Sequence, residues 1–186
     1  RETGAELGIA IDGDGDRIGA VDERGNVVWG DQLLAIHARE ILGRKPGSTF
    51  ISEVKASQVM YDDIGRRGGR AIMWKTGHSL IKAKMKEEKA ELAGEMSGHM
   101  FFADRYYGFD DALYSALRLI ELVDRSGGPL SRLLADLPRT VATPEIRVDC
   151  PDEEKFALVE RVKESFRNTH RIIDVDGVRV LFPEGW

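Results

Sequence analysis

Residues 12–17, with the sequence DGDGDR, place three aspartates on alternate positions with glycine between them and arginine directly after. The two glycines reach backbone dihedral angles that other residues avoid, so Asp12, Asp14 and Asp16 can turn their carboxylates to one side. Carboxylates held a few ångström apart repel one another unless a cation or protons intervene. A ligand set made only of oxygen suits Mg²⁺ or Ca²⁺ rather than Zn²⁺. The spacing therefore favours a hard divalent cation, with a solvated acidic turn as the alternative.

A calcium-binding EF-hand is a second alternative for this loop, since Glu23 falls at the twelfth loop position counted from Asp12. Two features weigh against it. The sixth position, which should be glycine, is Arg17, and the flanking segments are strand-like rather than helical. An arginine beside the acidic loop is suited to an anionic group such as phosphate, which a cation and a guanidinium group would share. A non-catalytic Ca²⁺-binding module thus stays open as an alternative, but a disfavoured one.

Three further loops carry polar residues that follow predicted strands. Lys55 follows one strand-like segment, and His78 lies where another strand gives way to a helix. Glu95, Ser97 and His99 belong to the segment GEMSGH, in which two glycines bracket the first two of them in a tight loop. In open α/β sheets, ligands bind beyond the carboxyl ends of the strands. We therefore expect these loops to line one site, although each lone lysine or histidine has a structural alternative as a solvated or capping side chain.

Other polar residues are predicted to be structural. Asp31 is expected to cap the N-terminus of the helix that follows it. Asp110 or Asp111 is expected near the first turn of the longest helix, and Asp62 and Asp63 on an exposed helix face. None of these residues is assigned a function.

The elements that must position the candidate residues alternate between short β-rich segments and helical patterns. Single strands are predicted at residues 7–11, 48–54, 70–74, 90–94, 99–103 and 145–150, and hairpins at 18–30 and 171–182. Helices are predicted at residues 32–44, 57–69, 78–89, 109–128 and 152–167. This order predicts an α/β fold with a mixed, mostly parallel sheet flanked by helices. A change of rhythm near residues 139–144 predicts a boundary, followed by a partial α+β domain.

Composition bounds the possible partners. The 27 Lys and Arg residues against 32 Asp and Glu give a net charge of −5, which argues against a nucleic-acid or membrane surface. No run of about 18 apolar residues occurs, so no membrane-spanning helix is expected. Cys150 is the single cysteine, which excludes an internal disulfide framework and fits a reducing, cytoplasmic compartment. Because the chain begins without Met and stops just after a strand-like run, we expect a piece of a longer protein.

Taken together, the segments DGDGDR, WKTGHS, GEMSGH and GFDDALYSA resemble the α-D-phosphohexomutase superfamily, and within it the bacterial phosphomannomutase/phosphoglucomutase branch. The resemblance covers nearly the whole chain in order. It implies a four-domain enzyme in which residues 1–27 form the tail of domain 2 with the metal loop. Residues 28–138 would then be domain 3 with the sugar-recognition loop, and residues 139–186 the first part of domain 4.

The implied activity interconverts hexose 1-phosphates and 6-phosphates of mannose or glucose, through a phosphoserine and a bisphosphorylated sugar intermediate. No serine in this chain lies in the family's nucleophile motif, so the fragment alone is expected to be inactive. Met96 favours the mannose/glucose branch, because glucosamine-phosphate mutases, the alternative branch, usually have GEQSGH at this loop. The partners implied are a hexose phosphate and the remaining domains of the same polypeptide.

The resemblance also implies a role for each candidate residue. Mg²⁺ is implied on Asp12, Asp14 and Asp16, where it also touches the phosphoserine. Glu95 and Ser97 match residues that hydrogen-bond the sugar hydroxyls. The basic residues that match catalytic positions lining the cleft are Arg17, Lys55, His78 and His99, of which the last three are also implied to bind substrate.

Overall fold

The computed structural model describes residues 4–186, which divide into two compact units, one ending at Pro138 and one running from Arg139 to Trp186. The elements of the first unit are β1 (Leu7–Ile11), β2 (Ile18–Asp22), β3 (Val27–Val28), α1 (Gly30–Arg44), β4 (Thr49–Glu53), α2 (Gln58–Arg66), β5 (Arg70–Trp74), α3 (His78–Glu88), β6 (Leu92–Gly94), β7 (Met100–Phe102), α4 (Ala112–Ser126) and α5 (Leu130–Leu133). The second unit contains α6 (Lys155–Arg167), β8 (Arg171–Ile173) and β9 (Arg179–Leu181).

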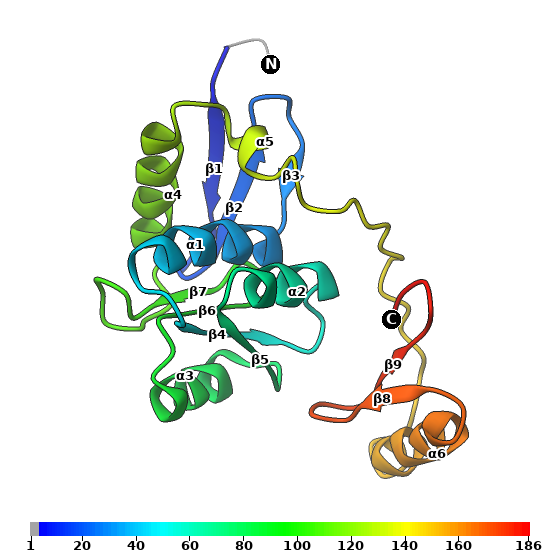
Figure 1. The fold of residues 1–186 in the computed structure, drawn as a ribbon. Coiled ribbons are helices and arrows are strands. Elements are labelled where there is room, and N and C mark those ends of the chain that lie inside the picture. The colour runs from blue at the N-terminus through cyan, green and yellow to red at the C-terminus, as the bar shows by residue number, and fades with distance from the viewer. Residues whose placement is uncertain (1–3) are drawn as a thin grey trace. The chain divides into compact units, whose positions relative to one another are not determined.

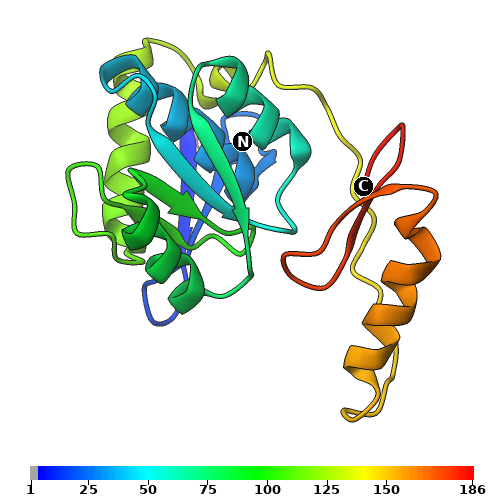
Figure 2. The same cartoon turned by 60° about the horizontal axis from the view of Figure 1, so that its bottom comes forward.

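The main sheet of the first unit has the strand order β5-β4-β6-β7. Strand β4 pairs in parallel with β5 and β6, while β7 runs antiparallel to β6, so the predicted mixed and mostly parallel sheet is confirmed. Helices α1 and α2 cover one face and α3 covers the other (Figure 1, Figure 2). Residues 50–53 of β4 are all buried, as expected for a central strand covered on both sides. The carboxyl ends of β4, β5 and β6 therefore meet at one edge, where the loops carrying Lys55, His78 and Glu95 begin.

A second, antiparallel sheet has the order β1-β2-β3. Ile11 pairs with Ile18 at the end of the β1–β2 register, so residues 12–17 form the hairpin loop. Gly15 has a φ of 81°, which a side chain at this position would disfavour. The backbone N–H of Ala112 donates to the Gly15 carbonyl at 3.0 Å, and this bond ties the loop to the start of α4. The aspartate loop is thus a hairpin turn fixed from outside its own sheet.

The N-terminus of α1 differs from the predicted one. Trp29 occupies the N-cap position, and its backbone N–H donates to Gln32 Oε1 at 3.0 Å. Asp31, predicted as the cap, lies inside the helix and is buried. Its carboxylate accepts from the backbone N–H groups of Gln32 at 2.8 Å and Ser57 at 3.0 Å. Asp31 is therefore not the N-cap residue; it joins the first turn of α1 to the loop between β4 and α2.

Two other expectations about local structure are wrong. Residues 145–150, predicted as a strand, form no regular element, because no strand of the second unit pairs with them. Asp63, predicted on an exposed face, is 3% exposed. Its carboxylate accepts from Arg39 Nε at 2.7 Å and Arg67 Nε at 3.2 Å. A carboxylate becomes tolerable in such a position because two guanidinium groups replace its water shell.

The second unit consists of one helix and a two-stranded antiparallel hairpin, in agreement with a partial α+β unit. Helix α6 has no buried residue. The ring–ring contacts of the unit are edge-on and involve Phe166, His170 and Phe182, with ring centroids 4.9–6.1 Å apart. Across residues 4–186, no helix combines the length and the apolar character that crossing a bilayer would require.

A buried ion cluster around Asp104 connects α1, α4 and the segment after β7. The side chain of Asp104 is fully buried and lies 2.6 Å from Arg44 Nη2, 3.0 Å from Arg118 Nη2 and 3.2 Å from Lys45 Nζ. Burial alone would raise the pKa of this carboxyl. The hydrogen bonds and charges of the surrounding cations outweigh burial and lower the pKa to about 2.

We expect Asp104→Asn to lower the free energy of unfolding by about 2 kcal/mol at pH 7. Because the folded-state pKa is depressed from 3.8 to about 2, this stabilisation is present above about pH 4 and is lost as the pH falls through 2. Urea unfolding followed by circular dichroism should therefore show a difference between variant and parent that shrinks on acidification. Asp124→Asn, which alters an exposed acid on α4, is the control. A difference that stays constant from pH 7 to pH 2.5 would contradict the assignment.

Candidate functional site

The aspartate loop and the loop between β6 and β7 lie against each other. Arg17 and His99 form an isolated antiparallel bridge, and the backbone N–H of Ile18 donates to the Gly98 carbonyl at 3.1 Å. Gly98 has a φ of 101°, and a Cβ there would lie 2.4 Å from the Ile18 carbonyl oxygen. Only glycine permits this approach of the two backbones. The structure thus brings residues 12–17 and 94–99, which belong to different sheets, into one cluster.

The three aspartates of the hairpin loop converge. Asp12, Asp14 and Asp16 each offer a carboxylate oxygen, and these oxygens all lie within 4.8 Å of one another. Among the described residues, Asp16 Oδ1 is a buried atom without a hydrogen-bond partner. An all-oxygen donor set with an unsatisfied buried oxygen fits Mg²⁺ or Ca²⁺. The donors present therefore suit the cation that the spacing predicts.

Arg17 closes the loop on one side. Its backbone N–H donates to Asp12 Oδ1 at 3.2 Å, and its Nε lies 3.5 Å from Asp12 Oδ2 and 3.6 Å from Asp16 Oδ1. Burial would raise the pKa of Asp12, but the backbone hydrogen bond and charge of Arg17 lower it below its usual value. The Arg17 side chain is about half exposed, at 51%, and so remains accessible to an anion.

His99 links the two loops through both ring nitrogens. Nδ1 lies 2.5 Å from Glu95 Oε2, while Nε2 lies 3.2 Å from Asp16 Oδ2 and 3.3 Å from Arg17 Nε. With Nδ1–H donating to Glu95, the lone pair of Nε2 accepts from the Arg17 N–H. The His99 side chain is 9% exposed, so its position is set by these partners. His99 connects the predicted metal loop to the predicted sugar loop within a single side chain.

Glu95 and Ser97 differ sharply in accessibility. Glu95 is 3% exposed, and both its oxygens are engaged, one by His99 and the other by the Gly77 backbone N–H at 2.8 Å. Ser97 is exposed, with Oγ 3.2 Å from His99 Nδ1. The structure therefore places both predicted sugar-binding residues in the cluster, but only the serine side chain is exposed to a ligand.

His78 reaches the same cluster from the first turn of α3. Its ring centroid is 5.9 Å from that of His99, and its Nδ1 lies 3.3 Å from Asp110 Oδ2. Lys82, one turn along α3, donates to Asp110 Oδ1 at 2.9 Å. Burial would raise the pKa of Asp110, but the bond from Lys82 outweighs it and lowers that pKa. Asp110 also offers an oxygen within 4.8 Å of the ligand atoms of Asp16 and His99.

Sequence reasoning missed Asp110 and Lys82 as members of this cluster. The neighbouring residue Asp111 is the one that caps α4, accepting from the Tyr114 backbone N–H at 2.8 Å. The spacing of His78 and Lys82, four residues apart on a predicted helix, was an available signal that both face the same side. The local sequence does not show which of the two adjacent aspartates caps α4 and which contacts Lys82.

Lys55 lies just beyond β4, where it is exposed. Its Nζ is 3.3 Å from Oε2 of Glu53, the last residue of the strand. Glu53 is fully buried and was also missed. The sequence offered one signal for Glu53, namely a charged residue at the end of an otherwise uncharged, strand-like segment. Within the described residues, Lys55 contacts neither His99 nor the three aspartates. It is included in the candidate site because it lies at the same edge of the sheet.

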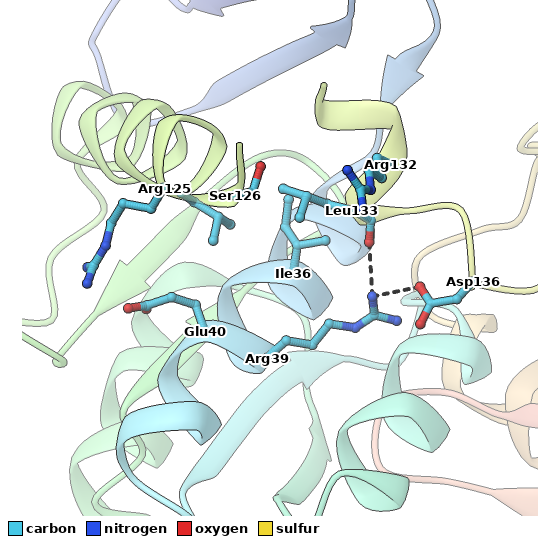
Figure 3. A pocket seen from close by; sticks show the side chains of 9 residues that line it. Ile36, Arg39, Glu40, Arg125, Ser126, Arg132, Leu133 and Asp136 are labelled. Atoms are coloured by element: carbon cyan, nitrogen blue, oxygen red, sulfur yellow. Dashed lines mark hydrogen bonds and ion pairs between the residues drawn. The ribbon is translucent and has the colours of Figure 1, made fainter. Parts of the chain in front are cut away.

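A separate pocket of about 500 Å³ lies between α1, α4 and α5 and contains none of these residues (Figure 3). Arg39 crosses its floor and donates to the Leu133 carbonyl at 2.9 Å and to Asp136 Oδ1 at 2.8 Å. Its cation is thereby paired within the protein. None of the candidate site residues lines this pocket, and we assign it no function.

Comparison with known proteins identifies the family. The profile of phosphoglucomutase/phosphomannomutase, alpha/beta/alpha domain III, matches residues 29–141. The phosphomannomutase/phosphoglucomutase of Pseudomonas putida is 46% identical over 187 residues, which cover 100% of this chain and 40% of that protein. A crystal structure of a phosphoglucomutase/phosphomannomutase family protein from Burkholderia thailandensis superposes with a TM-score of 0.87 at 42% identity, covering 96% of this chain and 38% of that one.

A more distant structure is the Aspergillus fumigatus N-acetylphosphoglucosamine mutase in complex with GlcNAc-6P and magnesium. It has a TM-score of 0.59 at 16% identity, over 70% of this chain and 35% of that one, and therefore shows likeness of fold alone. The chain spans about 40% of the length of the curated Pseudomonas relative. The resemblance carried by the aspartate loop and the GEMSGH segment is confirmed, and the chain belongs to the phosphoglucomutase/phosphomannomutase family.

Proposed function

We propose that this chain is the metal-binding and sugar-binding part of a mutase that interconverts hexose 1-phosphates and 6-phosphates of mannose or glucose. The observation that carries the proposal is the contact between the two loops. His99 lies 3.2 Å from Asp16 of the aspartate loop and 2.5 Å from Glu95 of the GEMSGH loop. A phosphoryl group beside the first loop and a sugar beside the second would therefore be neighbours.

In this proposal Asp12, Asp14 and Asp16 hold Mg²⁺, which when bound supplies positive charge that offsets the charge of the transferring phosphoryl group. The half-exposed guanidinium of Arg17 binds a phosphate oxygen from the protein side. Both contributions are electrostatic and positional. The nucleophile that carries the phosphoryl group, a phosphoserine, is proposed to come from a domain outside this chain.

The GEMSGH loop is proposed to recognise the sugar. Ser97 offers an exposed hydroxyl. Glu95 Oε2 becomes an acceptor for a sugar hydroxyl once the His99 Nδ1–H no longer donates to it, either because the proton leaves Nδ1 or because the ring turns away. His78 and His99 are the candidate groups for holding or moving the proton of a reacting hydroxyl, because both rings lie at the cluster and each has a carboxylate partner. Lys55 adds a cation at the same sheet edge.

The domain assignment also remains a proposal. Residues 1–27 would complete domain 2, residues 28–138 would form domain 3, and residues 139–186 would begin domain 4. We propose that the remaining domains of the polypeptide supply the phosphoserine and a further phosphate-binding loop. The chain alone would then be inactive, and its single cysteine fits a reducing, cytoplasmic compartment.

The test is an activity assay of the full-length protein with mannose 1-phosphate, glucose 1-phosphate and glucosamine 1-phosphate in the presence of Mg²⁺. We expect turnover of the first two to the corresponding 6-phosphates and little turnover of the third. Preference for glucosamine 1-phosphate would overturn the substrate assignment. Submicromolar Ca²⁺ affinity in calorimetry, with no response to any sugar phosphate, would instead support the non-catalytic calcium module.

A further inference from the structure

Glu53 is a buried carboxylate whose position calls for an explanation. It ends β4, the strand between β5 and β6, and its side chain is 1% exposed. Burial of an ionised carboxylate is costly unless hydrogen bonds and opposite charge replace its water. Glu53 Oε1 accepts from the Met96 backbone N–H at 2.8 Å. Oε2 has no hydrogen bond within the described part of the chain and lies 3.3 Å from Lys55 Nζ.

The two partners of this carboxylate belong to the two sides of the proposed sugar site. Met96 lies between Glu95 and Ser97, so its amide fixes the middle of the sugar-recognition loop. Lys55 stands on the loop after β4 and is exposed, so its ammonium group is available to a ligand. A carboxylate serves both, because it accepts from an amide through one oxygen and attracts an ammonium group through the other.

The surroundings of Glu53 hold its position independently of either partner. Its backbone carbonyl accepts from the Tyr61 hydroxyl at 2.8 Å, and β4 is paired on both sides. The far end of the loop that carries Lys55 is held by the buried carboxylate of Asp31 through the Ser57 backbone N–H at 3.0 Å. Glu53 is thus a rigid anchor for groups that lie on loops.

We propose that Glu53 is a positioning residue of the sugar site, whose single buried carboxylate holds the 95–97 loop through the Met96 amide and holds Lys55 through its ammonium group. This inference rests on the proposed mutase function and adds to it a residue that touches no substrate. Sugar recognition then depends on the oxygen of Glu53 that accepts from the Met96 amide, and placement of the Lys55 cation depends on the charge of the same side chain.

Two substitutions in the full-length protein separate the two contacts. Glu53→Ala removes both, and we expect KM for the hexose 1-phosphate to rise about tenfold and kcat to fall about tenfold. Glu53→Gln keeps an oxygen that accepts from Met96 but removes the negative charge facing Lys55. We therefore expect its KM to return to within about twofold of the parent value while kcat stays about tenfold lower.

Two controls isolate this role from loss of stability. Asp63→Asn alters another buried carboxylate, whose partners Arg39 and Arg67 are not residues of the candidate site, and should lower the melting temperature with KM and kcat unchanged. The Met96 amide resonance, observed by ¹H–¹⁵N correlation NMR, reports the hydrogen bond without reference to activity. It should shift upfield and exchange faster with solvent in Glu53→Ala, but not in Glu53→Gln.

The outcomes distinguish this inference from the proposed function. If the parent protein turns over no hexose phosphate, the proposed function fails, while the Met96 resonance still tests the contact. If the parent is active but both Glu53 variants change only the melting temperature, as Asp63→Asn does, the positioning role is overturned. Equal effects of Glu53→Gln and Glu53→Ala on KM would also contradict it.

Discussion

Replacing Asp14 with asparagine is expected to lower kcat of the full-length protein about 100-fold or more, with no change in its melting temperature. The three aspartates of the loop differ in what else they do. Asp12 accepts the Arg17 backbone N–H, and Asp16 faces both His99 and Arg17. The Asp14 side chain is exposed and makes no hydrogen bond or ion pair with the part of the chain that the structure describes. Substitution of Asp14 therefore changes the proposed cation site without removing a contact within the described part of the chain.

The magnitude follows from the charge that the substitution removes. An amide oxygen is a weaker ligand for a hard cation than a carboxylate, and asparagine lowers the negative charge of the site by one unit. Loss of electrostatic stabilisation at a site of charge transfer typically costs about two to three orders of magnitude in kcat. Excess Mg²⁺ should restore part of the rate if the main defect is affinity.

Steady-state kinetics with glucose 1-phosphate across a Mg²⁺ titration measure this effect. Asp124→Asn, which changes an exposed acid on α4, is the matched control and should behave as the parent does. A parent-like kcat for Asp14→Asn at low Mg²⁺ concentration would show that the loop is only a solvated turn. The same result would remove the basis for a phosphoryl group beside residues 12–17.

Sequence reasoning succeeded where a local pattern determines the outcome. The mostly parallel sheet follows from strands and helices that alternate at regular spacing, and the loop at residues 12–17 follows from glycines between acids. It failed at residues 145–150, where apolar and polar residues alternate as in a strand but no partner strand pairs with them. A strand is stabilised by its neighbours, and the local pattern does not say whether a neighbour exists.

The missed residues of the candidate site share one physical cause. Glu53 accepts from the backbone of Met96, 43 residues further along the chain. Asp110 accepts from Lys82, 28 residues before it. Such contacts arise only when the sheet brings distant strand ends to one edge. Asp63 was placed at the surface for the same reason, since its burial depends on Arg39 from another helix. Short-range spacing locates loops, whereas the partners that surround them depend on the topology.

Gly30→Ala should lower the free energy of unfolding by about 3 kcal/mol, although alanine normally stabilises a helix relative to glycine. Gly30 is the first residue of α1, where a Cβ would lie 2.1 Å from the Glu95 carbonyl oxygen and 3.1 Å from its carbonyl carbon. Both are backbone atoms of the loop that the Glu53 carboxylate also holds. The added methyl group must therefore displace either the helix or the 95–97 loop.

A second glycine in the same helix provides the control, because alanine is expected to change the free energy of unfolding in the opposite direction there. Gly43 also lies in α1, but a Cβ there meets nothing within 4 Å, so Gly43→Ala should stabilise by about 0.5–1 kcal/mol. Urea unfolding of both variants compares one substitution in one helix at two positions. In the full-length protein, Gly30→Ala should also raise KM for glucose 1-phosphate, because Glu95 and Met96 move, whereas Gly43→Ala should leave KM unchanged. If Gly30→Ala were as stable as Gly43→Ala, α1 and the 95–97 loop would not be in backbone contact, and this loop would lack the support described for it.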